Sequence, residues 1–219
     1  MSESPQRVAV IECHPVLRER LAELIAAEPG LELVGEADDL QGGVALLVSA
    51  RPELALVGLA LRKSSGTDLI KQARALSLPT ALLVYSGHDE ALYARRVLAD
   101  GAKGFISKDC TSGELLAAMR QVLSGKIYLS PAMTETMLHT LTASRIAAPV
   151  ARSVAQLSDR ELEVLEKIGE GKNTKEIATS LGLGLASVDT YRARIKEKLN
   201  LRNAFDLVCF AIRRQYDLN

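Results

Sequence analysis

Residues 7 to 129 alternate short apolar runs with stretches whose apolar residues recur at helical spacing. The apolar runs predict five strands, at 8–11, 31–34, 54–59, 81–85 and 104–106. Helical patterns fill the gaps, as in the spacing of Leu17, Leu21, Leu24 and Ile25 and over 41–50, 66–76, 89–100 and 112–124. Strict alternation of strand and helix predicts an α/β fold, with a doubly wound parallel sheet covered by helices on both faces.

Small and polar residues fall at or just past the ends of these strands. They are Glu12, Cys13, Gly58, Ser86 and Lys108. In an open parallel sheet the functional crevice lies at the carboxyl ends of the strands. We therefore expect these residues to converge on one edge of the sheet.

From Leu157 onward the pattern changes to four short helices joined by tight turns. Ser158–Glu161 and Asn173–Glu176 are capping boxes that mark the first two helix starts. The third and fourth helices are predicted at 185–200 and 204–215. An all-α segment of four short capped helices suits a helix-turn-helix domain.

A length of 219 residues favours two domains over one. We place one domain at 7–129 and the other at 156–216. Between them, 130–155 is expected to hold a short helix followed by an alanine-rich linker around Pro149, where periodicity is weak.

Composition narrows the function classes without identifying a partner. Apolar residues make up 47% and charged residues 25%, which argues against disorder, and the net charge is zero. Residues 183–214, however, hold seven basic and three acidic side chains. This local excess favours a phosphate-facing surface at that end of the chain.

Three widely spaced cysteines imply no disulfide or zinc framework. No apolar run approaches the roughly 18 residues of a membrane span. Residues 1–7 show no signal-peptide core. The expectation is a cytoplasmic protein with no membrane partner, no cofactor and no bound metal, in which His14 and His88 are ordinary loop residues.

One set of residues covers the second domain almost from end to end: Leu157-Ser-Asp-Arg-Glu161, Val164-Leu165, Gly171, Lys175-Glu-Ile-Ala178, Leu181, Val188, Lys198-Leu199 and Ala211-Ile-Arg213. With these residues the segment resembles the LuxR-type helix-turn-helix, against which a generic helical bundle is the plain alternative. The resemblance implies that the third helix enters the major groove of double-stranded DNA. It also implies a homodimer in which the last helix pairs with its symmetry mate, since one such domain alone binds weakly.

The DNA-contacting residues follow from that resemblance. The candidates are Lys175, Ser187, Asp189, Thr190, Arg192, Ala193, Arg194 and Lys198. The resemblance places Asp189, Thr190 and Ala193 at base edges, whereas the basic side chains are candidates for phosphate contacts or else are solubilising charges. Asp189 stands where the family often has lysine. It could accept from cytosine N4, repel DNA, or only favour the helix dipole.

A second set of residues spans the first domain: Ile11-Glu-Cys-His-Pro15, Gly66, Ser86-Gly-His-Asp89, Gly101-Ala102, Gly104-Phe105 and Ser107-Lys108. With these it resembles the receiver of the NarL/FixJ response-regulator family, which accepts a phosphoryl group on an aspartate with the help of magnesium. The resemblance assigns the first acidic position to Glu12, the hydroxyl to Ser86, the switch aromatic to Phe105 and the lysine to Lys108.

Two positions depart from the receiver pattern. Gly58 stands at the nucleophile, and Cys13 replaces the acid that ligates the metal directly. Without a carboxylate at Gly58 an acyl phosphate has no attachment point. A thiol is a poor ligand for magnesium. Conventional phosphorylation is therefore not expected, and the chain is not expected to be an enzyme.

The remaining pocket residues leave alternatives open. A buried charge seeks a partner, so Glu12 is expected to pair with Lys108. Lys108 could instead form an anion pocket with Arg62, or pack its stem and reach solvent. Cys13 could be a redox sensor or a small buried hydrophobe.

The leading hypothesis is a sequence-specific DNA-binding transcription regulator that acts without aspartyl phosphorylation. The alternative is an interaction protein that binds an unidentified protein or small-molecule ligand at its receiver, with weak or silenced DNA binding. Asp189 is the feature that supports this alternative.

Overall fold

The computed structural model describes residues 4–142, 154 and 156–216. The chain forms two compact units, Met1–Leu141 and Thr142–Asn219. The predicted fold class is confirmed in both: a parallel α/β sheet in the first unit and a helical domain in the second. Most of the predicted linker, 143–153 and 155, lies outside the described residues.

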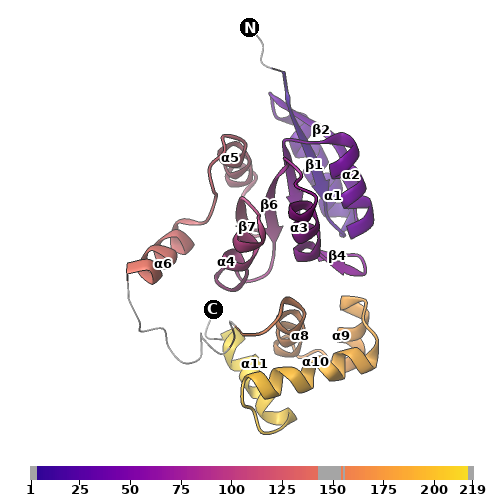
Figure 1. The fold of residues 1–219 in the computed structure, drawn as a ribbon, viewed down its shortest axis with the longest axis vertical. Coiled ribbons are helices and arrows are strands. Elements are labelled where there is room, and N and C mark those ends of the chain that lie inside the picture. The colour runs from indigo at the N-terminus through magenta and orange to yellow at the C-terminus, as the bar shows by residue number, and fades with distance from the viewer. Residues whose placement is uncertain (1–3, 143–153, 155, 217–219) are drawn as a thin grey trace. The chain divides into compact units, whose positions relative to one another are not determined.

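The first unit is built on a five-stranded parallel sheet (Figure 1). Its strands are β1 (Gln6–Ile11), β2 (Leu31–Ala37), β3 (Leu54–Val57), β6 (Ala81–Ser86) and β7 (Gly104–Ser107), in the order β2-β1-β3-β6-β7. Ile11 is in register with Val57, Val57 with Val84, and Val84 with Phe105. The central strands therefore end level with one another, and the residues that follow them share one edge.

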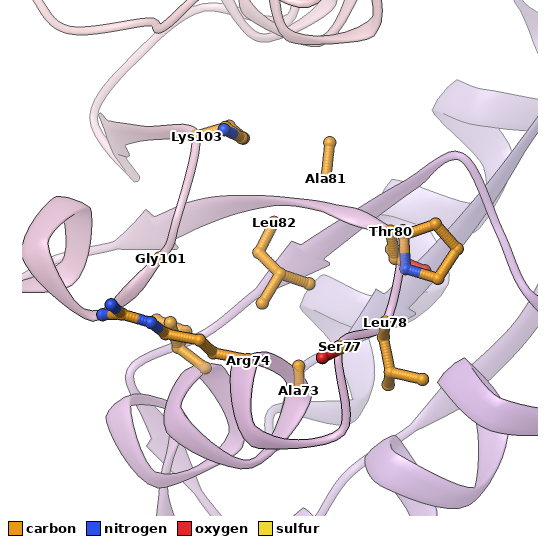
Figure 2. A pocket seen from close by; sticks show the side chains of 11 residues that line it. Ala73, Arg74, Ser77, Leu78, Thr80, Ala81, Leu82, Gly101 and Lys103 are labelled. Carbon is orange, nitrogen blue, oxygen red and sulfur yellow. The ribbon is translucent and has the colours of Figure 1, made fainter.

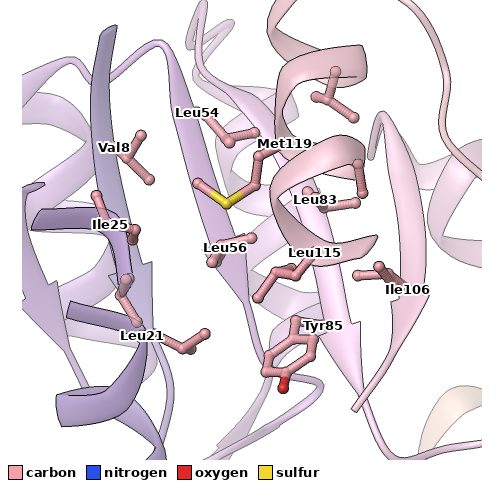
Figure 3. Packing of buried hydrophobic residues seen from close by; sticks show 13 residues of the cluster. Val8, Leu21, Ile25, Leu54, Leu56, Leu83, Tyr85, Ile106, Leu115 and Met119 are labelled. Carbon is pink, nitrogen blue, oxygen red and sulfur yellow. The ribbon is translucent and has the colours of Figure 1, made fainter. Parts of the chain in front are cut away.

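Helices cover both faces of this sheet. They are α1 (Pro15–Ala27), α2 (Leu40–Ala50), α3 (Gly66–Ala75), α4 (Glu90–Asp100) and α5 (Ser112–Leu123). α1 and α5 share one apolar cluster with the strands, in which Leu21, Leu56, Leu115 and Met119 pack together (Figure 3). α2, α3 and α4 follow one another along the other face. The buried residues are mostly aliphatic, with Tyr85, Tyr93 and Phe105 as the buried aromatic side chains.

A small hairpin after β3 is absent from the sequence prediction. It consists of β4 (Ala60–Leu61) and β5 (Ser64–Ser65), and Lys63 in its turn has a positive φ of 61°. The hairpin closes where the Gly66 N–H donates to the Leu59 carbonyl over 2.7 Å. A side chain at Gly66 would collide with the Gly58 carbonyl, so glycine is required there. Two-residue strands are too short to produce a readable alternation.

The helix α6 (Pro131–Thr142) follows the sheet, as expected from the sequence. The second unit contains α8 (Asp159–Gly169), α9 (Thr174–Leu181), α10 (Leu185–Lys198) and α11 (Ala204–Tyr216). Both predicted capping boxes are confirmed, because Ser158 and Asn173 each accept from the third helical N–H while the glutamate there accepts in return. No helix of the described residues is long and apolar enough to cross a membrane.

Candidate functional site

Four of the residues predicted to converge on one sheet edge lie together at the carboxyl ends of β1, β3, β6 and β7. The Lys108 ammonium lies 2.9 Å from Glu12 Oε2, and the Lys108 N–H donates to the Ser86 carbonyl over 2.9 Å. The Gly58 N–H donates to the Ile11 carbonyl, directly before Glu12. We call Glu12, Cys13, Gly58, Ser86, Phe105 and Lys108 the vestigial pocket.

The centre of the vestigial pocket is an ion pair between Glu12 and Lys108, as expected from the sequence. Their side chains are 2% and 22% exposed, and the ammonium lies 5.9 Å from the centroid of the Tyr85 ring. Burial by itself would raise the pKa of Glu12. The His14 backbone N–H and Lys108 outweigh that effect and hold the pKa of Glu12 below its ordinary value. Glu12 is thus a buried, charged acceptor.

A side chain at Gly58 would require the Glu12 carboxylate to move. A Cβ built on Gly58 would lie 2.5 Å from Glu12 Oε2, closer than real Cβ atoms approach an oxygen. The Glu12 carboxylate thus occupies the space next to the backbone at position 58. The same carboxylate, directly after β1, is the one that accepts from the Lys108 ammonium.

Beside the ion pair, Glu12, Cys13 and His14 form a compact cluster. Glu12 Oε1 accepts from the His14 N–H at 2.9 Å and lies 2.5 Å from His14 Nδ1. The Cys13 sulfur lies 3.6 Å from that same oxygen and 3.4 Å from His14 Nδ1. Burial and the negative charge of Glu12 raise the pKa of the Cys13 thiol to about 11. A thiol that stays protonated at neutral pH does not support the redox-sensor alternative.

Ser86 and Phe105 are both buried at the same edge. The Ser86 hydroxyl lies 2.7 Å from His88 Nδ1 and accepts from the His88 N–H, so its described bonds are made within its own loop. The Phe105 side chain is fully buried on β7. Neither bond of the Ser86 hydroxyl reaches the Glu12–Lys108 pair.

The alternative in which Lys108 and Arg62 form an anion pocket is not supported. Arg62 pairs with Asp38 through its guanidinium, and its N–H donates to the Asp38 carbonyl over 3.0 Å. Lys108 pairs with Glu12. Each cation is therefore neutralised by its own acid.

The donor set also does not fit the magnesium of the receiver resemblance. Magnesium prefers hard oxygen ligands in octahedral geometry. Here Cys13 offers sulfur, Gly58 offers no side chain, and one oxygen of the only remaining acid, Glu12, is bonded to Lys108. The side chains of the vestigial pocket therefore do not make a magnesium site.

A separate hollow of about 330 Å³ lies at the opposite ends of the strands, between the end of α3 and the starts of β6 and β7 (Figure 2). Arg74 and Lys103 are its basic side chains, and Leu78, Pro79 and Leu82 contribute apolar surface. The Arg74 guanidinium donates to the Ala99 carbonyl over 2.7 Å, which ties it to the protein backbone. The lining contains no carboxylate, thiol or imidazole.

In the second unit, α10 has one buried and one exposed face. Val188 and Ile195 are fully buried and hold the helix against the domain. Most of the DNA-contact candidates lie on the exposed face: Ser187, Asp189, Thr190, Ala193 and Arg194 are exposed, and Arg192 is half-buried. Lys175 is exposed in the first turn of α9. The helix predicted to read DNA therefore presents these side chains to solvent.

Lys198 differs from the other basic candidates because it bonds within the domain. Its ammonium lies 2.6 Å from Glu161 Oε2 and 3.3 Å from the Gln156 carbonyl. Burial by itself would raise the pKa of Glu161, but the hydrogen bonds from Lys198 and Ser158 lower it below its ordinary value. The sequence showed Glu161 only as a capping residue. The signal available in the sequence was a capping-box glutamate, which needs a partner if it is buried, together with a lysine at the end of the third helix.

Comparison with known families covers both units. Residues 8–120 match the response regulator receiver domain, and residues 155–211 match the luxR family of bacterial regulatory proteins. The transcription regulator BvgA of Bordetella pertussis is 32% identical over 207 residues, which is 94% of this chain and 97% of BvgA. The transcriptional regulatory protein UhpA of Escherichia coli is 32% identical over 96% of this chain and 97% of its own length.

Solved structures of response regulators are also similar to this chain. The receiver domain of NarL from Mycobacterium tuberculosis has a TM-score of 0.55 at 31% identity, over 57% of this chain and 100% of that domain. RcsB from Salmonella enterica serovar Typhimurium, solved on the promoter rprA with the phosphomimetic BeF3-, has a TM-score of 0.63 and covers 95% of this chain and 98% of RcsB. At 18% identity the second likeness concerns the fold alone.

Proposed function

Because the chain belongs to the NarL/FixJ family of response regulators, DNA-binding transcription regulators with a receiver and a LuxR-type helix-turn-helix domain, we propose that it regulates transcription without aspartyl phosphorylation. The observation that carries the proposal is the Glu12–Lys108 ion pair beside Gly58. Lys108, Ser86 and Phe105 remain, but the nucleophile and the metal-ligating acid are gone. A covalent intermediate has no atom on which to form.

The second unit has the features that a helix-turn-helix requires to bind DNA. α10 is held by a buried face and exposes Asp189, Thr190, Ala193 and Arg194. We propose that this helix reads double-stranded DNA in the major groove, that Lys175, Arg192 and Arg194 contact phosphates, and that two copies bind two half-sites as a homodimer. The protein would work in the cytoplasm, where the DNA is. Lys198, already bonded to Glu161, is the weakest candidate for a phosphate contact.

Intact-mass measurement tests the loss of phosphorylation. The full chain is incubated with acetyl phosphate and magnesium, with UhpA from Escherichia coli as the control. We expect a phosphoryl adduct on the control and none on this chain. An adduct on this chain would overturn the proposal and direct attention to another acceptor side chain.

Genome-wide footprinting of the unmodified chain tests the DNA-binding half. Discrete protected sites of twofold symmetry, obtained without any phosphoryl donor, are the expected result. An absence of sites would favour the alternative of an interaction protein with silenced DNA binding.

A further inference from the structure

The cluster of Glu12, Cys13 and His14 has a ligand set that differs from that of a receiver. A receiver binds magnesium through oxygens, whereas this cluster offers one carboxylate oxygen, one sulfur and one imidazole nitrogen. All three ligand atoms lie within 4.8 Å of one another. Thiolate and imidazole ligands select zinc-like transition ions over magnesium.

We propose that Glu12 Oε1, Cys13 Sγ and His14 Nδ1 bind a divalent transition ion of the zinc class, with solvent as the fourth ligand. The proposal is independent of the regulator's DNA binding and goes beyond the sequence prediction, which expects no metal here. On binding, the Cys13 thiol gives its proton to solvent and the sulfur coordinates as thiolate.

The distances suit such an ion. Bond lengths of about 2.3 Å for sulfur and about 2.0–2.2 Å for nitrogen and oxygen, at tetrahedral angles, place sulfur about 3.6 Å from each lighter ligand. The observed separations are 3.6 Å from sulfur to Glu12 Oε1 and 3.4 Å from sulfur to His14 Nδ1. Only the 2.5 Å between Glu12 Oε1 and His14 Nδ1 must widen, to about 3.4 Å. The His14 side chain is 64% exposed and is free to make that adjustment.

A second observation is the way Glu12 is oriented. Its Oε2 is bonded to Lys108 at 2.9 Å, which leaves Oε1 facing Cys13 and His14. In metal sites, partners behind the ligands fix their orientation in this way. The His14 backbone N–H also donates to Oε1 and holds the loop against the carboxylate.

The charges around the cluster also permit a divalent ion. Lys108 faces the other oxygen of Glu12. Arg18 donates to the Glu12 carbonyl over 2.7 Å and pairs with Glu36 at 3.3 Å. The ion brings two positive charges and the Cys13 thiolate offsets one of them; because Glu12 is already paired with Lys108, the bound site carries one net positive charge.

Cobalt(II) is the probe for this site, because a cobalt–thiolate bond adds a charge-transfer absorption that oxygen ligands do not give. The metal-free full chain is titrated with cobalt, and zinc is then added as competitor. We expect a thiolate band at one equivalent, its loss on adding zinc, and no loss on adding excess magnesium.

Single variants assign the ligands. Cys13→Ser should abolish the band, and His14→Gln, at an exposed position that leaves folding intact, should weaken cobalt binding at least about 10-fold, because even indirect metal partners are worth 10–100-fold. Cys110→Ser and Cys209→Ser are the matched controls and should keep the band. Persistence of the band in Cys13→Ser, or equal affinity of wild type and His14→Gln, would overturn the proposal.

Discussion

Each unit of this molecule contains a buried glutamate bonded to a lysine from a distant element. In the first unit Glu12 at the end of β1 meets Lys108 after β7, and in the second Glu161 on α8 meets Lys198 on α10. Both carboxylates are nearly inaccessible, and the pKa of each is lowered by its hydrogen-bond donors against the effect of burial. The two pairs look alike but have different surroundings.

Glu161 belongs to a capping box in which both hydrogen bonds are present. It closes the capping box of α8 with Ser158 and ties that helix to the end of α10. Glu12, by contrast, lies beside a residue without a side chain: its Oε2 is 2.5 Å from the position that a Cβ on Gly58 would take. Similar ion pairs thus join two helices in one unit and lie beside Gly58 at the sheet edge in the other. Burial and pairing alone do not identify an active site.

The largest effect is expected from breaking the first pair. Glu12→Gln should lower the free energy of unfolding by about 2–3 kcal/mol, somewhat below the 3–5 kcal/mol of fully buried pairs because Lys108 keeps some solvent access. Equilibrium urea unfolding measures the loss, and peptide-resolved hydrogen exchange assigns it to the first unit. Adding Lys108→Met should recover most of it; a loss that stays the same in the double variant would mean that the pairing is not its cause.

An aspartate introduced at position 58 should not enable phosphorylation. Gly58→Asp introduces a side chain 2.5 Å from Glu12 Oε2 and a second carboxylate beside one lysine, so we expect about 2 kcal/mol of destabilisation. Gly58→Ala, which adds the contact without the charge, should lose less. Intact-mass measurement should still find no phosphoryl adduct, since Cys13 does not ligate magnesium. An adduct on Gly58→Asp would show that the pocket retains its chemistry.

The second pair should show its contribution through pH. The folded pKa of Glu161 lies below its ordinary value of 4.5, so its stabilisation is present above that pH and is lost as pH falls through the folded pKa. Glu161→Gln should therefore cost about 1 kcal/mol at pH 7 and progressively less below pH 4.5. Glu176→Gln, in the capping box of the more exposed α9, is the matched control and should cost less at pH 7. A difference that grows on acidification would contradict the assigned sign.

The smallest expected effect is a difference in the salt dependence of DNA binding between variants of two basic residues of α10. Arg194→Ala should reduce the salt dependence of DNA binding by about one unit of slope, as expected for a lost phosphate contact. Lys198→Ala should change the slope less, because Lys198 is bonded to Glu161, and should lower stability instead. Equal changes in slope for both variants would place Lys198 on the phosphates, which is one of the two alternatives that the sequence left open for it.

The sequence predicted the sheet, its flanking helices and both capping boxes, since these depend on local periodicity and cap chemistry. It also predicted the Glu12–Lys108 pair from the rule that a buried charge needs a partner. It missed the hairpin at Ala60–Ser65, whose strands are too short to alternate. It also missed the bonds of His14 to Glu12 and of Lys198 to Glu161, because side-chain direction and separations of 37 residues are not encoded in periodicity.

DNA affinity with and without a phosphoryl mimic tests the central claim most directly. The full chain is titrated onto a site recovered by footprinting, at fixed salt, in the presence and absence of beryllofluoride and magnesium, with UhpA from Escherichia coli on its own site as the control. The account predicts the same dissociation constant for this chain under both conditions. A magnesium-dependent tightening of about 10-fold or more, equal to about 1.4 kcal/mol of binding free energy, would contradict it.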